Sequence, residues 1–93
     1  MNSEINQKII DYLIKYKPQM IAIFGSYARK EQKKGSDIDI LVSFKQDLTL
    51  IDLSRIKNEL SEQLKIKVDL ITQKALHPKL KAYIEKDLKI IYE

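Results

Sequence analysis

The chain contains no cysteine, only two glycines, and only two arginines among its 17 basic residues. The absence of cysteine excludes a disulfide framework and any metal site built from thiolates. Apolar runs are short, and none approaches the roughly 20 residues that a membrane-spanning helix needs. The N-terminal stretch lacks a basic segment followed by an apolar one, so we expect no signal peptide, no membrane partner and a cytoplasmic location.

The formal net charge is +4 over 93 residues. A surplus of positive charge fits either a phosphate-bearing partner or a lysine-rich surface that is merely solvated. We favour the second explanation, because no arginine-rich run or interleaved aromatic series supports nucleic-acid recognition. The length predicts one domain, spanning 1–93, whose small core is only marginally stable without a partner.

The spacing of apolar residues predicts helices and strands in alternation. The helical pattern covers residues 3–17, 26–32, 49–64 and a segment that begins at Pro78. Strand-like apolar runs cover residues 20–24, 37–44 and 66–72. The last six residues form either a short strand or a tail. This alternation predicts a two-layer domain of the α/β (α+β) class.

Two aspartates, Asp37 and Asp39, stand one residue apart in an apolar run. In a strand their side chains project on the same face, with Cα atoms roughly 6–7 Å apart. Two ionised carboxylates this close repel one another, and a divalent cation between them removes the repulsion. Hard oxygen ligands suit Mg²⁺ or Mn²⁺. Asp69 offers a third carboxylate in the middle of the strand predicted at 66–72, where aspartate is unfavourable.

Each aspartate taken alone also has an ordinary structural explanation. Asp37 follows Gly35 and Ser36, so a turn or a solvated strand end accounts for it. Asp69 is explained equally well as a surface residue of an edge strand. Asp39 is harder to explain in this way, because it lies between two isoleucines. Three acids on two strands favour one shared metal site over three coincidences.

Gly25 and Ser26 follow the apolar run at 20–24 and open a predicted short helix. Glycine allows the backbone to approach a ligand closely, and the amides of a helix N-terminus favour an anion. A Gly-Ser pair is also common in an ordinary strand-to-helix turn. Beside a site with carboxylates and metal, however, a phosphate-binding turn favours phosphoryl or nucleotidyl transfer.

The two halves of this pattern resemble the signature of the DNA polymerase β-like nucleotidyltransferase superfamily. The matching segments are FGSYAR at 24–29 and SDIDILV at 36–42, followed by Asp69 on a later strand. Residues 76–80, LHPKL, are also typical of the minimal nucleotidyltransferases of prokaryotes. The resemblance covers residues 18–93. It implies a single two-layer nucleotidyltransferase domain with a mixed β-sheet and helices packed on one face.

The resemblance implies a role for each residue of the pattern. Asp37, Asp39 and Asp69 are implied to be the catalytic carboxylates that bind two metal ions. Asp69 is also implied to help deprotonate the incoming hydroxyl. Gly25 and Ser26 are implied to hold the β- and γ-phosphates of a nucleoside triphosphate. The acceptor oxygen then attacks the α-phosphorus in line, and pyrophosphate leaves.

Arg29 belongs to the matching segment, whereas the residue after it departs from the family pattern. The resemblance implies that Arg29 is a cation for the triphosphate or the acceptor, and a solvated helix residue explains it equally well. Members of the superfamily commonly carry glycine after this arginine, whereas this chain has Lys30. Either the short helix continues through Lys30, or Lys30 adopts a backbone angle that is unusual for a residue other than glycine.

A chain of 93 residues leaves no room for a separate acceptor-binding domain. The acceptor surface is therefore expected on a protein partner or on a second copy of the chain. Minimal nucleotidyltransferases often act as antitoxins of HEPN-domain ribonuclease toxins, and several transfer AMP to a toxin tyrosine. The resemblance thus implies an adenylyltransferase antitoxin that uses Mg²⁺ and ATP. Its partner would be a HEPN toxin encoded nearby, in a homodimeric or hetero-oligomeric assembly.

Two other functions stay open. A non-catalytic antitoxin would neutralise its partner by contact alone, and Asp39→Ala would leave that neutralisation intact. A small-molecule nucleotidyltransferase of the aminoglycoside-modifying type would act as a dimer with an acidic cleft at the self-interface. Four apolar residues lie off the main stripes of their helices and are candidates either for partner contact or for internal packing: Ile10, Ile14, Leu48 and Ile51.

Overall fold

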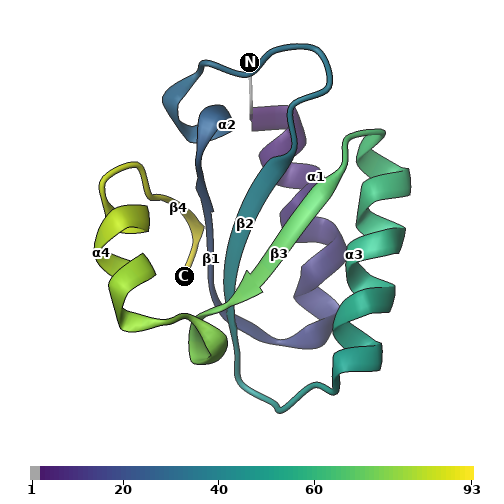
Figure 1. Ribbon diagram of the computed structural model, residues 1–93. Coiled ribbons are helices and arrows are strands. Elements are labelled where there is room, and N and C mark those ends of the chain that lie inside the picture. Colours follow the sequence, from purple (N-terminus) through teal and green to yellow (C-terminus); the bar gives the residue numbers. More distant parts are fainter. Residues whose placement is uncertain (1–2) are drawn as a thin grey trace.

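The computed structural model describes residues 3–93, in which helices and strands alternate (Figure 1). The elements are α1 (Ser3–Leu13), β1 (Pro18–Phe24), α2 (Ser26–Arg29), β2 (Ile38–Phe44), α3 (Leu50–Leu64), β3 (Val68–Thr72), α4 (Pro78–Glu85) and β4 (Lys89–Tyr92), with 3₁₀ turns at Ile14–Tyr16 and Gln73–Ala75. The predicted alternation is confirmed. The last residues form a strand and not a tail.

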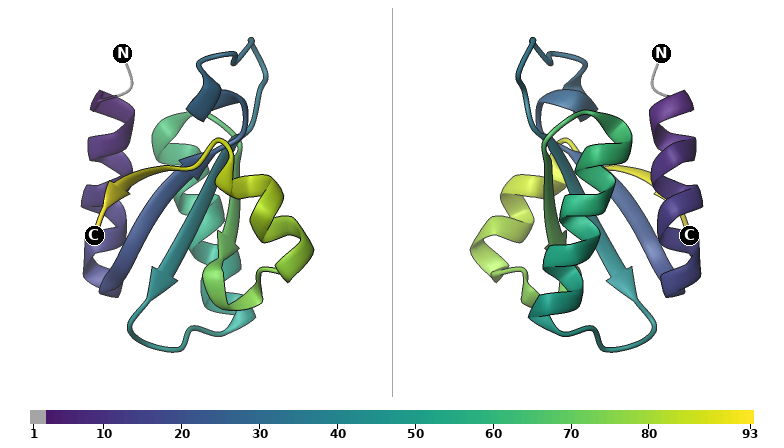
Figure 2. Two further views of the ribbon diagram at one scale, coloured as in Figure 1. Left: turned by 90° about the vertical axis from the view of Figure 1, so that its left-hand side faces the viewer. Right: turned by 90° about the vertical axis from the view of Figure 1, so that its right-hand side faces the viewer.

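The strands form one mixed sheet in the order β3-β2-β1-β4. β1 is antiparallel to both β2 and β4, whereas β2 and β3 are parallel and are connected through α3. α1 and α3 cover one face of the sheet. The short α4 lies on the other side, in the connection that leads from β3 to β4 (Figure 2). The predicted fold class is confirmed, and α4 gives the second face a partial cover.

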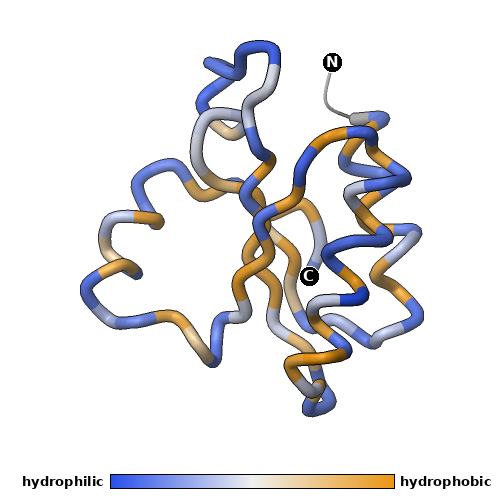
Figure 3. The backbone as a smooth tube through the Cα atoms, turned by 45° about the vertical axis from the view of Figure 1, so that its right-hand side comes forward, coloured by the Kyte–Doolittle hydropathy of each residue, from blue (hydrophilic) through white to orange (hydrophobic). Residues whose placement is uncertain are grey.

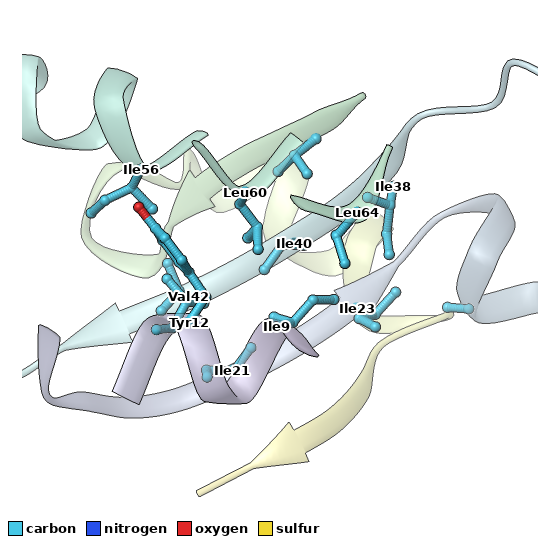
Figure 4. Close-up of a cluster of buried hydrophobic side chains, with 13 residues drawn as sticks. Ile9, Tyr12, Ile21, Ile23, Ile38, Ile40, Val42, Ile56, Leu60 and Leu64 are labelled. Atoms are coloured by element: carbon cyan, nitrogen blue, oxygen red, sulfur yellow. The ribbon is translucent and has the colours of Figure 1, made fainter. Parts of the chain in front are cut away.

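The core lies between the sheet and the α1–α3 layer. Alternation along β1 and β2 directs every second side chain into this layer, because successive strand residues point to opposite faces. Figure 4 shows the resulting cluster, which includes Ile9, Tyr12, Ile21, Ile23, Ile38, Ile40, Val42, Ile56, Leu60 and Leu64. At its margin the Tyr12 hydroxyl donates a hydrogen bond to Glu59. Burial raises the pKa of the Tyr12 phenol above its usual range, so the phenol stays neutral.

Local signals fix the ends of the helices. At the start of α3, the Asp52 amide donates to Thr49 Oγ1 and the Thr49 amide donates to Asp52 Oδ2, both at 3.0 Å. This reciprocal pair is a capping box. α1 ends at Leu13, earlier than predicted, and a 3₁₀ turn follows. That turn stops at Lys17, which adopts a left-handed conformation with φ 58° directly before Pro18.

Polar and apolar segments separate clearly along the backbone. The strands are largely hydrophobic, whereas the loop between α2 and β2 is hydrophilic (Figure 3). Of the four apolar residues singled out as candidate contact surface, Ile10 and Leu48 pack against the core. Ile14 and Ile51 are 45% and 79% exposed. Among residues 3–93, the structure shows no helix with the length and apolar character to cross a bilayer.

Candidate active site

The predicted site residues meet at one end of the sheet, where β1 ends and where β2 and β3 begin (Figure 1). In the strand register, Asp39 is paired with Phe24 on one side and with Asp69 on the other. These three residues form a row across three strands, with neighbouring strands about 4.8 Å apart. The two aspartates are therefore direct neighbours, although 30 positions separate them in the chain.

Strand alternation turns these carboxylates away from the α1–α3 layer. The residues on either side of Asp39 are fully buried isoleucines of the core, so Asp39 itself projects from the opposite face. Val68 is likewise buried, and the adjacent Asp69 is exposed. Asp37 directly precedes β2 and is also exposed. The sequence prediction placed Asp37 and Asp39 on one side of a strand, and this arrangement is consistent with it.

Asp39 is the electrostatic centre of the group. Its partial burial, followed by repulsion from Asp69 and then Asp37, raises its pKa from 3.8 to about 6. The positive charge of Arg29 opposes this rise. A carboxylate pushed toward its neutral form by other carboxylates is one that a cation would return to its charged form.

All three predicted metal ligands are carboxylates, which is the donor type that Mg²⁺ and Mn²⁺ prefer. Their mutual repulsion at Asp39 shows that they share one patch of the surface. Within residues 3–93, no three acidic, histidine or cysteine side chains already stand in a geometry that would ligate one ion. The residues fit a divalent cation in the chemistry of their donor atoms, and Asp39 and Asp69 are direct neighbours in the strand register.

Gly25 brings the turn after β1 against the Asp39 carboxylate. Its backbone angles, φ 77° and ψ −154°, lie in a region that only glycine adopts without strain. A Cβ atom added at this position would lie 2.2 Å from Asp39 Oδ2. Glycine is therefore required both by the backbone conformation and by the close approach. Ser26 follows as the first residue of α2 and is half-buried beside it.

α2 is a single turn closed by a left-handed residue. Lys30 has φ 60° and ψ 35°, so the second of the two conformations considered for it is the one observed. The Glu31 amide donates to the Ser26 carbonyl at 2.9 Å, and the Lys30 amide donates to the Tyr27 carbonyl at 3.3 Å. This is the Schellman arrangement that normally places glycine at the left-handed position. The substitution of lysine leaves that local geometry in place.

Arg29 is held by carboxylates that the sequence did not single out. Its Nε lies 2.8 Å from Glu31 Oε1, and its Nη1 lies 2.8 Å from Asp87 Oδ2. Both contacts favour the charged guanidinium and raise its pKa further. Asp87 is 58 positions away in the sequence and belongs to no recognisable pattern, so only the fold reveals it. The structure thus gives Arg29 two partners of its own within the protein.

Two cavities within residues 3–93 lie apart from the carboxylates. One of about 650 Å³ lies at the opposite end of β2 and is lined in part by Phe44, Leu48 and Lys74. A smaller one of about 220 Å³ lies behind α2, where Tyr27 and Lys30 line it. Asp37 and Asp69 are instead exposed, and Asp39 is half-buried beside them.

A Gly-Ser turn against Asp39, with Asp69 beside it on a mixed sheet, is the arrangement that the resemblance to nucleotidyltransferases implies. Residues 7–93 match the family model described as polymerase beta, nucleotidyltransferase. The chain belongs to this family.

Within this family, the chain is similar to proteins named as protein adenylyltransferases. A protein of Methanocaldococcus jannaschii, provisionally named protein adenylyltransferase, is 52% identical over 79 residues, which are 85% of each chain. Protein adenylyltransferase MntA of Thermococcus cleftensis is 39% identical over 56 residues, which are 60% of this chain and 57% of that protein. The recognised resemblance to minimal nucleotidyltransferases is confirmed.

Solved structures agree with this placement. A toxin–antitoxin crystal structure with AMP-PNP contains a chain that matches with a TM-score of 0.86 and 30% identity, covering 94% of this chain and 72% of that one. A complex of a tri-AMPylated Shewanella oneidensis HEPN toxin with its MNT antitoxin matches with a TM-score of 0.82 and 28% identity, over 99% and 72% of the two chains.

Proposed function

We propose that this protein is a metal-dependent adenylyltransferase that transfers AMP from ATP to a tyrosine hydroxyl of a HEPN-domain toxin and thereby acts as an antitoxin. The observation that carries the proposal is the junction of the Gly25 turn with the Asp39 carboxylate, beside Asp69. The names of the relatives and the HEPN complexes among the solved structures supply the donor and the acceptor class.

In the proposed site, Asp37, Asp39 and Asp69 would hold two divalent cations, Mg²⁺ or Mn²⁺, which would supply positive charge against the charge of the phosphates. The Gly25–Ser26 turn holds the β- and γ-phosphates through its amides and the serine hydroxyl. Asp69 orients the acceptor hydroxyl and takes its proton. A bond forms between that oxygen and the α-phosphorus. The bond from the α-phosphorus to the bridging oxygen breaks, and pyrophosphate leaves.

The position of the label in ATP tests this chemistry directly. The protein is incubated with Mg²⁺, the HEPN protein encoded beside it, and ATP labelled at either the α- or the γ-phosphorus. Adenylyl transfer labels the partner only from α-labelled ATP, and Asp37→Asn or Asp39→Asn abolishes the label. Asp11→Asn is a matched control, because Asp11 is an exposed residue of α1 outside the site. Label from γ-labelled ATP would identify a kinase instead.

Neutralisation by contact alone is the second candidate. It is favoured by the exposure of Leu50 and Ile51 at the start of α3, which are 84% and 79% exposed. These apolar side chains have no part in the proposed chemistry and offer a surface to a partner. Under this alternative, Asp39→Asn still neutralises the toxin, whereas Leu50→Ser/Ile51→Ser does not. The transfer proposal expects the reverse result for Asp39→Asn.

A further inference from the structure

One ion pair connects the C-terminal segment with the proposed phosphate-binding turn. Arg29 Nη1 lies 2.8 Å from Asp87 Oδ2. Arg29 is the last residue of α2, which begins directly after Gly25, and Asp87 stands two residues before β4. Neither the carboxylate chemistry nor the core requires this contact, so it calls for an explanation of its own.

The sheet brings the segment before β4 close to the turn that follows β1. In the antiparallel pairing of β1 with β4, Ile23 is opposite Lys89, and Asp87 lies two residues before Lys89. The Asp87 amide donates to the Ile84 carbonyl at 3.1 Å, and Ile84 is the buried residue of α4. The backbone of Asp87 is therefore held in the turn that follows α4 and leads into β4.

Arg29 is correspondingly fixed to the turn. The Arg29 amide donates to the Gly25 carbonyl at 3.1 Å. A displacement of Arg29 would therefore also displace the Gly25 backbone, which lies against Asp39. Its guanidinium already faces two carboxylates, Asp87 and Glu31, each at 2.8 Å. A guanidinium neutralised twice is poorly suited to attract a triphosphate.

From these contacts we infer that Asp87 is a positioning residue for nucleotide binding. Its pair with Arg29 acts as a strut that holds the Gly25–Ser26 turn against the C-terminal strand. Arg29 contributes to nucleotide affinity through this strut and not by contacting a phosphate. The inference rests on the proposed function, in which this turn holds the β- and γ-phosphates.

Calorimetric titration of the full chain with AMP-PNP and Mg²⁺ tests the inference. Asp87→Asn and Arg29→Gln are each expected to weaken binding about three-fold, in the range of a partly exposed ion pair. The double variant is expected to bind no more weakly than either single variant, and Asp87→Glu retains the affinity. Binding of AMP, which lacks the outer phosphates, stays unchanged. Asp47→Asn is the matched control. Asp47 lies in the loop after β2 and forms an exposed ion pair with Lys74, with 2.9 Å between Asp47 Oδ1 and Lys74 Nζ.

If Arg29 contacts a phosphate directly, Asp87→Asn should change the affinity for AMP-PNP in the opposite direction. Asp87→Asn would then release the guanidinium and tighten AMP-PNP binding, whereas Arg29→Gln would weaken it. That pattern, or losses that add in the double variant, would overturn the inference.

Hydrogen exchange without ligand separates this inference from the proposed function. The Lys30 and Glu31 amides are bonded within the α2 turn, and they are expected to exchange faster in Asp87→Asn than in Asp47→Asn. If the wild-type chain does not bind AMP-PNP, the proposed function fails. Exchange at these two amides then decides by itself whether the Arg29–Asp87 pair stabilises the turn. Unchanged exchange would rule the strut out.

Discussion

At Gly25 the conformation of the backbone and the space beside it impose the same requirement. A φ of 77° strains any other residue, and an added methyl group would meet Asp39 Oδ2 at 2.2 Å. The methyl group can be accommodated only if the carboxylate or the turn moves. Either movement separates the two parts of the site that must act on the same triphosphate.

We therefore expect Gly25→Ala to reduce AMP transfer about 100-fold, the order of loss that a displacement of about 1 Å produces. Gly35→Ala is the matched control. Gly35 also has a positive φ, 88°, but a Cβ atom there would have no neighbour within 4 Å. That variant should lose stability, by about 1 kcal/mol, and retain transfer. Equal transfer rates for the two variants, measured with labelled ATP, would contradict the proposed role of the turn.

The charge on Asp39 destabilises the protein in the absence of metal. Its pKa in the folded state is about 6, compared with 3.8 for the ordinary group, so the folded chain binds the proton more tightly than the unfolded chain. The folding free energy therefore becomes less favourable as the pH rises through about 4 to 6. Above that window the penalty is fully present.

Asp39→Asn is accordingly expected to raise the Tm at pH 7 in EDTA. The gain is about 1 kcal/mol, after allowance for the solvent screening of a half-buried group. The gain should fade as the pH is lowered to 4, where Asp39 of the folded wild type is already neutral. Thermal unfolding of both proteins at several pH values checks the sign. A variant that is less stable than the wild type at pH 7 would contradict this explanation.

At the scale of elements, α2 ends on a residue that is poorly suited to its conformation. Lys30 takes a left-handed conformation that costs a residue with a Cβ atom about 1–2 kcal/mol. Glycine lacks this cost, but its greater freedom in the unfolded chain makes folding less favourable by about 0.5–1 kcal/mol. Lys30→Gly should therefore stabilise the protein by about 0.5–1 kcal/mol in denaturant unfolding. Lys33→Gly, in the same loop but without a positive φ, should not stabilise it.

Some elements could be predicted from the sequence because their signals are local. The capping box at Thr49 and Asp52, the apolar run of β1 and the proline that opens α4 are each read within a few residues. The conformation of Lys30 could only be narrowed to two alternatives. It depends on where the Schellman hydrogen bonds of α2 close, and the sequence does not determine that.

The assembly of the site was less accessible to sequence analysis. The same-face placement of Asp37 and Asp39 follows from the period of a strand, but the pairing of Asp39 with Asp69 depends on sheet register. The three acids indicated one shared site, but not that Asp39 and Asp69 lie directly opposite one another. Asp87 could not be found at all, since a partly buried carboxylate 58 positions from its arginine has no local signature. Contacts made through tertiary structure are the ones that the pattern of residues leaves out.

For the whole molecule, the carboxylates lie on an open face of a small sheet. Neither of the two cavities described contains them, and α4 gives that face only a partial cover. An exposed site leaves room for a large acceptor, and the proposed function places the acceptor tyrosine on a toxin. The catalytic carboxylates and the exposed α3 surface can then be tested separately in one complex.

The most direct test is the mass of the cognate HEPN toxin after incubation with this protein, ATP and Mg²⁺. We expect the toxin to gain one or more AMP groups on tyrosine and to lose its ribonuclease activity. Both changes should be absent with Asp39→Asn and present with Asp11→Asn. A toxin that is inactivated while its mass stays unchanged would contradict the account and establish neutralisation by contact.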